Sequence, residues 1–382
     1  MINNCRVCGC RFNNEAFLKF VNMPATAQYL PDQKTKGKDK GKDFSVIQCS
    51  FCGLVQLNSD HVPYYREVIR AAGFSREMNE FRSRQFSEFV KEYSLKGKKI
   101  VEIGCGQGEY LSLLKKSGLR ASGLEFGSNS IKKCQKQGLD VAKGFVNKEN
   151  YRIKSSPFDA FFMLSFLEHL PEPGKVLKGI HGNLSDNAVG IIEVPNFDMI
   201  QRDGLMTEFM SDHLMYFTKD TLSIALKMNG FEIIKCQEVC YDYIISATII
   251  KRKRIDANLF LKQKEKIQRE IEKFIKLFRG KKIAVWGAGH QALAAMSLFG
   301  MSGKIDYVID SAPFKQGKLT PATHIPIVAP EKLFSDPVDA LLVIAGSYSE
   351  EIIKIASEKF LIRNLAVLRN NQLELVRLKA KK

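Results

Sequence analysis

The sequence lacks an apolar stretch long enough to cross a membrane, and residues 243–250 form one of its longest apolar runs. A spanning helix needs about 20 predominantly apolar residues, so we expect no membrane span. The chain also starts without a basic leader or a small-residue cleavage site, which argues against a secretion signal. We therefore expect a cytoplasmic protein.

Aromatic residues are missing from the basic segments. Five lysines lie between Lys34 and Lys42, and residues 251–254 are all basic, in a chain of formal net charge +17. Such clusters can attract nucleic acid, anionic membranes or phosphorylated substrates. Surfaces that bind single-stranded nucleic acid usually offer aromatic rings on which bases stack. We therefore interpret the clusters as a solvated loop and a domain junction, and expect no nucleic-acid partner.

Size and composition indicate a globular protein of two or three domains. The chain has 382 residues, of which 45% are hydrophobic and 26% charged. Domains of this size can each bury a hydrophobic core. We expect a monomer or a weak oligomer.

The nine cysteines include two C-x-x-C pairs, Cys5 with Cys8 and Cys49 with Cys52, each followed by a glycine. In a cytosolic chain they do not predict disulfides. Two thiolates in such a turn can bind one metal ion while backbone amides point at the sulfurs. Four thiolates leave no ligand position for water, so the pairs predict a structural Zn²⁺ whose loss unfolds the N-terminal module. Reduced thiols without a metal are the alternative, and Cys10 is a competing ligand.

A glycine-rich turn follows the apolar run 99–103. Residues 101–108 read Val-Glu-Ile-Gly-Cys-Gly-Gln-Gly. The three glycines let the backbone turn tightly beneath a ligand before a helix that begins near Glu109. Glu125 ends the next apolar run, where doubly wound sheets place a carboxylate that binds a ribose diol.

The pattern E-x-G-x-G-x-G resembles motif I of class I S-adenosylmethionine (SAM) methyltransferases more than the G-x-G-x-x-G of dehydrogenases. Another nucleotide-binding turn is the alternative. The pattern predicts a SAM site formed by Glu102, Gly104, Gly106, Gly108 and Glu125.

Apolar runs and helical stretches alternate after the turn, which predicts a doubly wound, mostly parallel α/β sheet. Expected strands lie at 99–103, 120–124, around Val141, 158–164 and 188–194, and expected helices near 109–117, 128–137 and 172–184. A helical lead-in is expected from Pro63. A helix near 219–229 and runs at 232–239 and 243–251 predict an antiparallel edge, and 196–218 an irregular, substrate-gripping insert.

An amphipathic helix over 256–279 leads into a second α/β unit, which begins at Lys282-Ile-Ala-Val-Trp-Gly-Ala-Gly289. Its glycines open a helix after a strand, and the next strand, 307–309, ends at Asp310. Taken alone, this turn is compatible with a nicotinamide cofactor whose ribose binds Asp310. The same turn recurs wherever a helix packs closely on a strand, and we favour that interpretation.

Three features together resemble one family, the sugar C-methyltransferases that act on nucleotide-linked deoxysugars. They are the cysteine pairs, motif I and two C-terminal segments, 315–321 (KQGKLTP) and 324–328 (HIPIV), which look like the family's K-Q-G-x-x-T-P and H-I-P-I. The resemblance covers nearly the whole chain. It implies a zinc-binding module at 1–60, a SAM-dependent methyltransferase domain with its lead-in at 61–254, and a Rossmann-like domain at 255–382. The last would contribute to the cleft that holds the nucleotide-sugar.

The resemblance also implies catalytic positions. After the fourth strand of the sheet, His169 ends the segment Ser-Phe-Leu-Glu-His and matches a family active-site histidine. His213 matches a second one in Met-Ser-Asp-His, where Asp212 stands in for a glutamate and Met210 for a tyrosine. A histidine near a strand end can also simply cap backbone groups.

Carbon methylation beside a keto group needs a base for the carbon-bound proton and donors for the enolate that develops. Histidine can be that base, but Met210 cannot donate a hydrogen bond. Another family tyrosine precedes motif I, and neither Tyr64 nor Tyr65 can be assigned to it. We therefore predict methyl transfer from SAM to a nucleotide-linked sugar, with His213, His169 and Asp212 in acid/base roles. Transfer to oxygen or nitrogen, which needs no enolate stabilisation, stays open.

Three other functions compete. A nucleic-acid methyltransferase fits the positive charge, but base-amine methyltransferases commonly carry Asn/Asp-Pro-Pro after the fourth strand, where this chain has Ser-Phe-Leu-Glu-His. A non-catalytic protein with a relic SAM fold is disfavoured by the intact motif I. An oxidoreductase would use the turn at Gly287.

Overall fold

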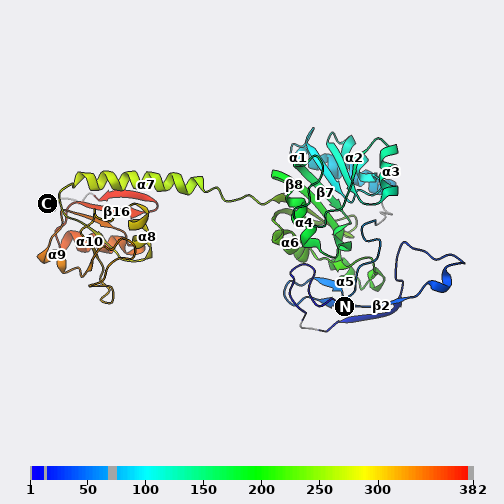
Figure 1. Cartoon of the computed structure of the whole chain (residues 1–382), viewed down its shortest axis with the longest axis horizontal. Helices are drawn as coiled ribbons and strands as arrows, with labels where there is room; N and C mark the ends of the chain where they lie inside the picture. The colour runs from blue at the N-terminus through cyan, green and yellow to red at the C-terminus, as the bar shows by residue number, and fades with distance from the viewer. Residues whose placement is uncertain (1, 13–14, 68–74, 377–382) are drawn as a thin grey trace. The chain divides into compact units, whose positions relative to one another are not determined.

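The computed structural model describes residues 2–12, 15–67 and 75–376 and divides into two compact units, residues 1–253 and 254–382 (Figure 1). The three-part division at 60 and 254 stays a prediction. In the structure, residues 1–60 belong to the same compact unit as the central sheet. The first unit contains two sheets and the second unit contains one, and each unit has its own hydrophobic core.

The central sheet of the first unit has seven strands in the order β10-β11-β8-β7-β4-β5-β6. They are β4 Lys99–Ile103, β5 Arg120–Glu125, β6 Asp140–Lys143, β7 Phe158–Leu164, β8 Leu184–Pro195, β10 Phe231–Val239 and β11 Ile244–Lys251. Neighbours from β8 to β6 run parallel, and β11 is antiparallel to both of its neighbours. The doubly wound sheet with an antiparallel edge is thus confirmed.

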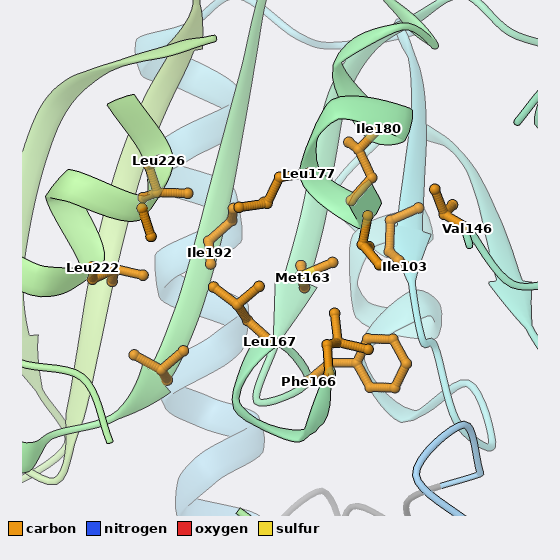
Figure 2. Close-up of a cluster of buried hydrophobic side chains, with 14 of the residues drawn as sticks. Ile103, Val146, Met163, Phe166, Leu167, Leu177, Ile180, Ile192, Leu222 and Leu226 are labelled. Carbon is orange, nitrogen blue, oxygen red and sulfur yellow. The ribbon is translucent and has the colours of Figure 1, made fainter. Parts of the chain in front are cut away.

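Helices cover both faces of this sheet because alternate strand residues point to opposite faces. They are α1 Arg76–Glu92, α2 Glu109–Lys116, α3 Ser128–Lys136, α4 Pro173–His181 and α6 Lys219–Met228. Ile100 and Phe162 pack with Phe86 of α1 on one face. Val101 and Ile103 pack with residues of α4 and α6 on the opposite face. Figure 2 shows Ile103 in this buried cluster.

The cysteine pairs belong to a second, four-stranded sheet of the first unit, in the order β1-β2-β3-β9. Its strands are β1 Leu18–Met23, β2 Lys42–Gln48, β3 Val55–Leu57 and β9 Met215–Tyr216. Strand β9 lies in the insert 196–218, which also forms helix α5, Phe197–Arg202. The expectation of an irregular insert is therefore wrong in part, because the insert completes the N-terminal sheet and packs α5 against it.

The described part of the expected lead-in is short. Residues 64–67 form turns, residues 68–74 lie outside the described ranges, and α1 starts at Arg76 after the Ser75 side chain caps it. Three-residue 3₁₀ helices occupy Lys36–Lys38, Leu167–His169 and Met206–Glu208.

The second unit is a six-stranded sheet in the order β14-β13-β12-β15-β16-β17, parallel except for β17. Its elements are α7 Asn258–Leu277, β12 Ile283–Trp286, α8 His290–Leu298, β13 Tyr307–Ile309, β14 Ile327–Val328, α9 Lys332–Ser335, β15 Ala340–Val343, α10 Ser349–Glu358, β16 Leu365–Arg369 and β17 Gln372–Val376. A short 3₁₀ helix, Gly346–Tyr348, precedes α10. This order is the Rossmann order, which confirms a Rossmann-like unit.

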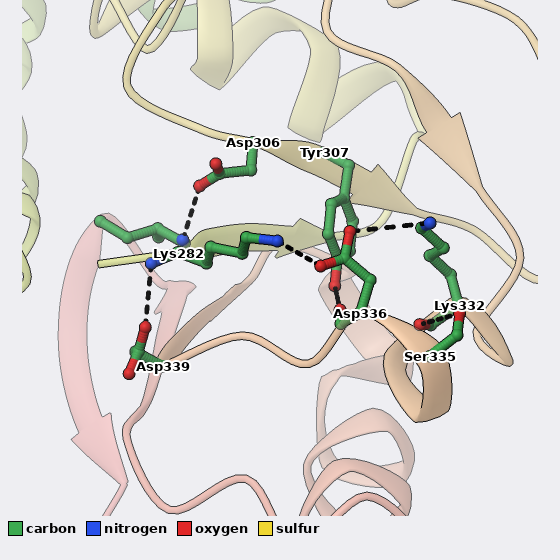
Figure 3. A network of polar contacts seen from close by, with 8 residues as sticks. Lys282, Asp306, Tyr307, Lys332, Ser335, Asp336 and Asp339 are labelled. Carbon is green, nitrogen blue, oxygen red and sulfur yellow. Dashed lines mark hydrogen bonds and ion pairs between the residues drawn. The ribbon is translucent and has the colours of Figure 1, made fainter. Parts of the chain in front are cut away.

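A polar network closes the amino end of β12 (Figure 3). The backbone N–H of Lys282 donates to Asp339 at 2.9 Å, and that of Ile283 donates to Asp306 at 2.8 Å. The Lys282 ammonium pairs with Asp336. These contacts satisfy backbone donors at the end of the sheet where no ligand site is expected, since ligands bind at the carboxyl ends of parallel strands.

Within the residues that the structure describes, every helix is too short or too polar to span a lipid bilayer.

Shortening a buried side chain of α4 should destabilise the core of the first unit. Leu177 is fully buried and points into the cluster of Figure 2, so Leu177→Ala should lower the free energy of unfolding by about 2–5 kcal/mol through lost burial and a cavity. Leu30, which is 82% exposed, is the matched control, and Leu30→Ala should change stability by less than about 0.5 kcal/mol. Denaturant unfolding of both variants measures this, and equal losses would contradict the packing.

Candidate active site and metal centre

The four cysteines converge on one point. Their Sγ atoms lie within 4.8 Å of one another, with Cys5 and Cys52 at 3.5 Å and Cys8 and Cys49 at 3.6 Å. Tetrahedral zinc with Zn–S bonds of about 2.3 Å places its sulfurs about 3.8 Å apart. The arrangement therefore fits a four-sulfur zinc centre. The other candidate, Cys10, does not belong to this group within the described residues.

The glycines after the pairs make these turns possible. Gly9 and Gly53 have φ of 74° and 79°, and their N–H groups donate to the carbonyl oxygens of Cys5 and Cys49, both at 2.9 Å. Two of the thiols disfavour ionisation: the contact with Cys52, together with burial, raises the pKa of Cys5, and burial raises the pKa of Cys49. A bound cation is what stabilises four thiolates at this separation.

The glycine turn of motif I joins β4 to α2. Gly104, Gly106 and Gly108 have φ of 68°, 57° and 87°, which side chains with a Cβ rarely adopt. A Cβ on Gly104 would also lie 2.9 Å from the ring of Phe166. Glu102 lies two residues earlier, fully buried in β4.

Glu125 binds this turn. Its Oε2 accepts from the N–H of Gly106 at 2.9 Å, and its Oε1 accepts from the N–H groups of Phe126 and Gly127 at 3.0 and 2.8 Å. The carboxylate is 5% exposed at the end of β5. The structure thus brings together the two parts of the predicted cofactor site.

A cavity of about 10 Å³ remains beside Gly104, with Phe126, Phe145 and Phe166 among its lining residues. Figure 2 shows the Phe166 ring beside the buried cluster that contains Ile103. Arg66 stacks over Phe126 and Phe145 at the same place, 5.3 and 5.0 Å from the ring centroids. These aromatic side chains surround the small cavity beside the turn.

The two candidate histidines lie side by side, with ring centroids 4.8 Å apart. His169 ends the loop after β7, and its Nδ1 donates to the backbone carbonyl of Asp212 at 2.8 Å. This bond leaves Nε2 as the unprotonated nitrogen of the neutral ring. His213 is partly exposed and His169 is buried.

The carboxylate of Asp212 contacts a tyrosine. The Tyr64 hydroxyl donates to it, with 2.8 Å to each oxygen, and the N–H of Ala27 reaches both the hydroxyl and Oδ1, at 2.7 and 3.1 Å. Burial, with the Asp212 carboxylate, raises the pKa of Tyr64 to about 12. Of the two tyrosines that the sequence left open, Tyr64 is therefore the one bonded to Asp212, the residue before His213.

The histidines resist protonation. Burial lowers the pKa of His169 to about 4, against the opposing effect of the Asp212 carbonyl. Burial, followed by the neighbouring His169, lowers the pKa of His213 to about 3. Both rings are therefore neutral near pH 7.

Glu168 and the two histidines place three ligand atoms within 4.8 Å of one another. The Glu168 Oε1 and His169 Nε2 atoms are 3.8 Å apart, whereas two ligands of one tetrahedral ion lie about 3.4 Å apart. The group is therefore wider than a formed metal site.

In the second unit, a cavity of about 700 Å³ opens at the carboxyl ends of β12, β13 and β15, lined among others by Gly287, Asp310, Lys315 and Tyr348. Asp310 accepts from the N–H of Ala288 and from Lys315, both at 2.8 Å. A Cβ on Gly287 would clash with the carbonyl of Ile344. The glycine is thus required by close packing, as favoured from the sequence, and Asp310 holds the turn in place.

Two family models match the chain: a methyltransferase domain over residues 78–236 and a C-methyltransferase C-terminal domain over 255–363. The C-methyltransferase NovU of Streptomyces niveus is 22% identical over 95% of this chain and 94% of its own length. The chain is an S-adenosylmethionine-dependent methyltransferase, and its C-terminal part matches the C-methyltransferase model. Motif I and the strand order of the central sheet agree with this assignment.

Other relatives resemble only part of the methyltransferase. A ubiquinone biosynthesis O-methyltransferase of Methylococcus capsulatus is 32% identical over 24% of this chain and 40% of its own length. The solved structure of the plantazolicin methyltransferase BpumL with SAH covers 47% of this chain and 86% of its own, at 16% identity and a TM-score of 0.39. That score is too low to support an inference about function.

Sequence reasoning missed several contacts of the site. Phe166 and Glu168 lie in the Ser-Phe-Leu-Glu-His segment but carried no assigned role, and Tyr64 was not distinguished from Tyr65, because their partners lie far away in the chain. Ala27 acts through its backbone N–H, and no residue-type signal marks such a group.

The low pKa values of the histidines predict a pH dependence of stability. The unfolded chain binds protons below about pH 6.5, whereas folded His169 and His213 do so only near pH 4 and 3. Their contribution to stability is therefore complete above pH 6.5 and is lost as the pH falls toward those values. Each histidine adds up to about 1.4 kcal/mol per pH unit to the slope. Denaturation of the wild type and His169→Asn between pH 7 and 5 should give a shallower slope for the variant; equal slopes would contradict the burial of a neutral His169.

Proposed function

We propose that the enzyme transfers the methyl group of SAM to a carbon atom of a nucleotide-linked sugar. One observation carries this proposal: Tyr64, Asp212, His169 and His213 form one cluster, and its loop after β7 also packs Phe166 on the cofactor turn. A methyl acceptor above this edge of the sheet meets a neutral base and a phenol.

The roles follow from exposure and bonding. His213 is the base, because its neutral ring is partly exposed, whereas His169 is buried with Nδ1 committed to the Asp212 carbonyl. Tyr64 supplies the hydroxyl that stabilises the enolate once its proton turns from the Asp212 carboxylate to the acceptor, the role that Met210 cannot fill. Glu102, Gly104, Gly106, Gly108 and Glu125 bind SAM, with the Glu125 carboxylate on the ribose.

Methyl transfer to an oxygen or nitrogen of a related sugar is the second candidate, favoured by Met210. The Tyr64–Asp212 contact weakens that interpretation, because a phenol bonded to the residue before His213 offers a replacement donor for an enolate.

The substrate class follows from the second unit and from the family resemblance. The carboxyl-edge cavity of about 700 Å³ has Lys315 and the amino end of α8 in its lining. Cations and helix amino ends bind phosphate groups, so this cavity of the second unit suits the phosphate groups of a nucleotide. In the first unit, we assign a structural Zn²⁺ to Cys5, Cys8, Cys49 and Cys52.

Glu125→Gln should weaken SAM binding at least about tenfold, because the amide loses the negative charge and turns an N–H₂ group toward backbone donors. Isothermal calorimetry with SAM on metal-loaded protein measures this. Glu88→Gln, on the exposed surface of α1, is the control and should bind SAM as the wild type does. Unchanged affinity in Glu125→Gln would remove Glu125 from the cofactor site.

His213→Asn should abolish product while SAM affinity stays within about twofold, because the base acts on the acceptor and not on the cofactor. Incubation of SAM and enzyme with a panel of nucleotide-linked keto- and hydroxy-sugars, followed by mass spectrometry, should reveal one sugar that gains a methyl group. Fragmentation then separates a carbon from an oxygen or nitrogen acceptor. Full turnover in His213→Asn would refute the base assignment, and a methylated oxygen would select the second candidate.

A further inference from the structure

The cysteine turns touch both loops that carry the candidate catalytic histidines. Arg6 lies between Cys5 and Cys8, and its guanidinium donates to two backbone carbonyls: Nη1 to Pro171 at 3.1 Å and Nη2 to Ser59 at 2.6 Å. Pro171 is two residues beyond His169. The first C-x-x-C turn therefore supports the His169 loop directly.

A second contact reaches the His213 loop. Strand β3, which follows the Cys49–Cys52 turn, pairs with β9, and the N–H of Leu57 donates to the carbonyl of Leu214 at 3.0 Å. The backbone N–H of Arg6 donates to Gln56 of this strand at 2.9 Å. Gln56 is fully buried, so the two cysteine turns and the residues after His213 share one hydrogen-bonded layer.

A third contact comes from the segment between β1 and β2. The carbonyl of Pro24 accepts from the Ser211 hydroxyl at 3.1 Å. Three residues later, the N–H of Ala27 reaches Tyr64 and Asp212. The carbonyl of that same Asp212 binds His169.

We propose that the cysteine module, meaning the Cys5–Cys8 and Cys49–Cys52 turns with strands β1 to β3, is a positioning element for methyl transfer. Arg6 is the positioning residue that couples the Cys5–Cys8 turn to the His169 loop. This inference rests on the proposed zinc centre and on the proposed roles of the histidines. The metal fixes the turn on both sides of Arg6, so its removal releases the guanidinium from the Pro171 and Ser59 carbonyls. His169 then loses its fixed ring orientation although no metal touches the reacting atoms. Displacements of about 1 Å at such a site can cost about 100-fold in rate.

Arg6→Lys and Arg6→Gln test the coupling, because neither side chain can donate to two carbonyls in the fixed geometry of a guanidinium. Arg11→Gln, which removes an exposed positive charge from the same module, is the matched control. The readout is the pH titration of the His169 ring by NMR in full-length, zinc-loaded protein, with assignment by His169→Asn. In both Arg6 variants the pKa of His169 should move from about 4 toward its ordinary value, with zinc content and SAM affinity unchanged. The control should titrate as the wild type does.

Zinc removal by a chelator should produce the same shift in the wild-type chain. If the Arg6 variants fail to fold, two variants of Ala27 replace them. Ala27→Pro removes the backbone N–H and should shift the His169 titration. Ala27→Gly keeps the N–H and should leave the titration unchanged. An unchanged His169 titration in the variants and after zinc removal overturns the inference. Failure of the proposed function is a separate result, because the titration and the zinc content need no acceptor. Once the methyl acceptor is identified, Arg6→Lys should lower kcat about 10-fold or more at a similar KM.

Discussion

The parallel alignment of β4, β5 and β7 is the constraint on which the site depends. Parallel strands end at the same edge of a sheet, so the glycine turn, Glu125 and the Phe166–His169 loop meet there although they are far apart in the sequence. The buried cluster beneath them fixes the strand ends (Figure 2). The bond from the Gly106 N–H to the Glu125 carboxylate then holds the turn against β5.

The two units use a similar glycine turn differently. In the first unit Glu125 lies across the turn at a place where aromatic rings line a small cavity. In the second, Asp310 is bound to Ala288 and Lys315, and Gly287 is required by its approach to Ile344. The same strand–turn–helix unit thus forms the predicted cofactor site in one sheet and a packing junction beside a large cavity in the other.

The N-terminal sheet is an integral part of the methyltransferase unit. Strand β9 pairs with β3, and α5 packs on the same layer. The predicted boundary at residue 60 rests on the cysteine pairs, which are local signals in the sequence. The pairing of β3 with residues 215–216 is a long-range contact, which the sequence does not reveal. A strand of two residues carries no period from which it can be predicted.

The sequence by itself determined the doubly wound sheet, the SAM-dependent activity and the spacing of the cysteine ligands, because these depend on local patterns: apolar periodicity, glycines with positive φ and paired thiols. Only the tertiary structure decided which tyrosine reaches Asp212, how the two histidine rings meet and what Arg6 and Ala27 bind. Those contacts join residues up to 185 apart, several through backbone groups that every residue type carries. The identity of a side chain therefore does not predict these contacts. They form because the two sheets of the first unit pack together.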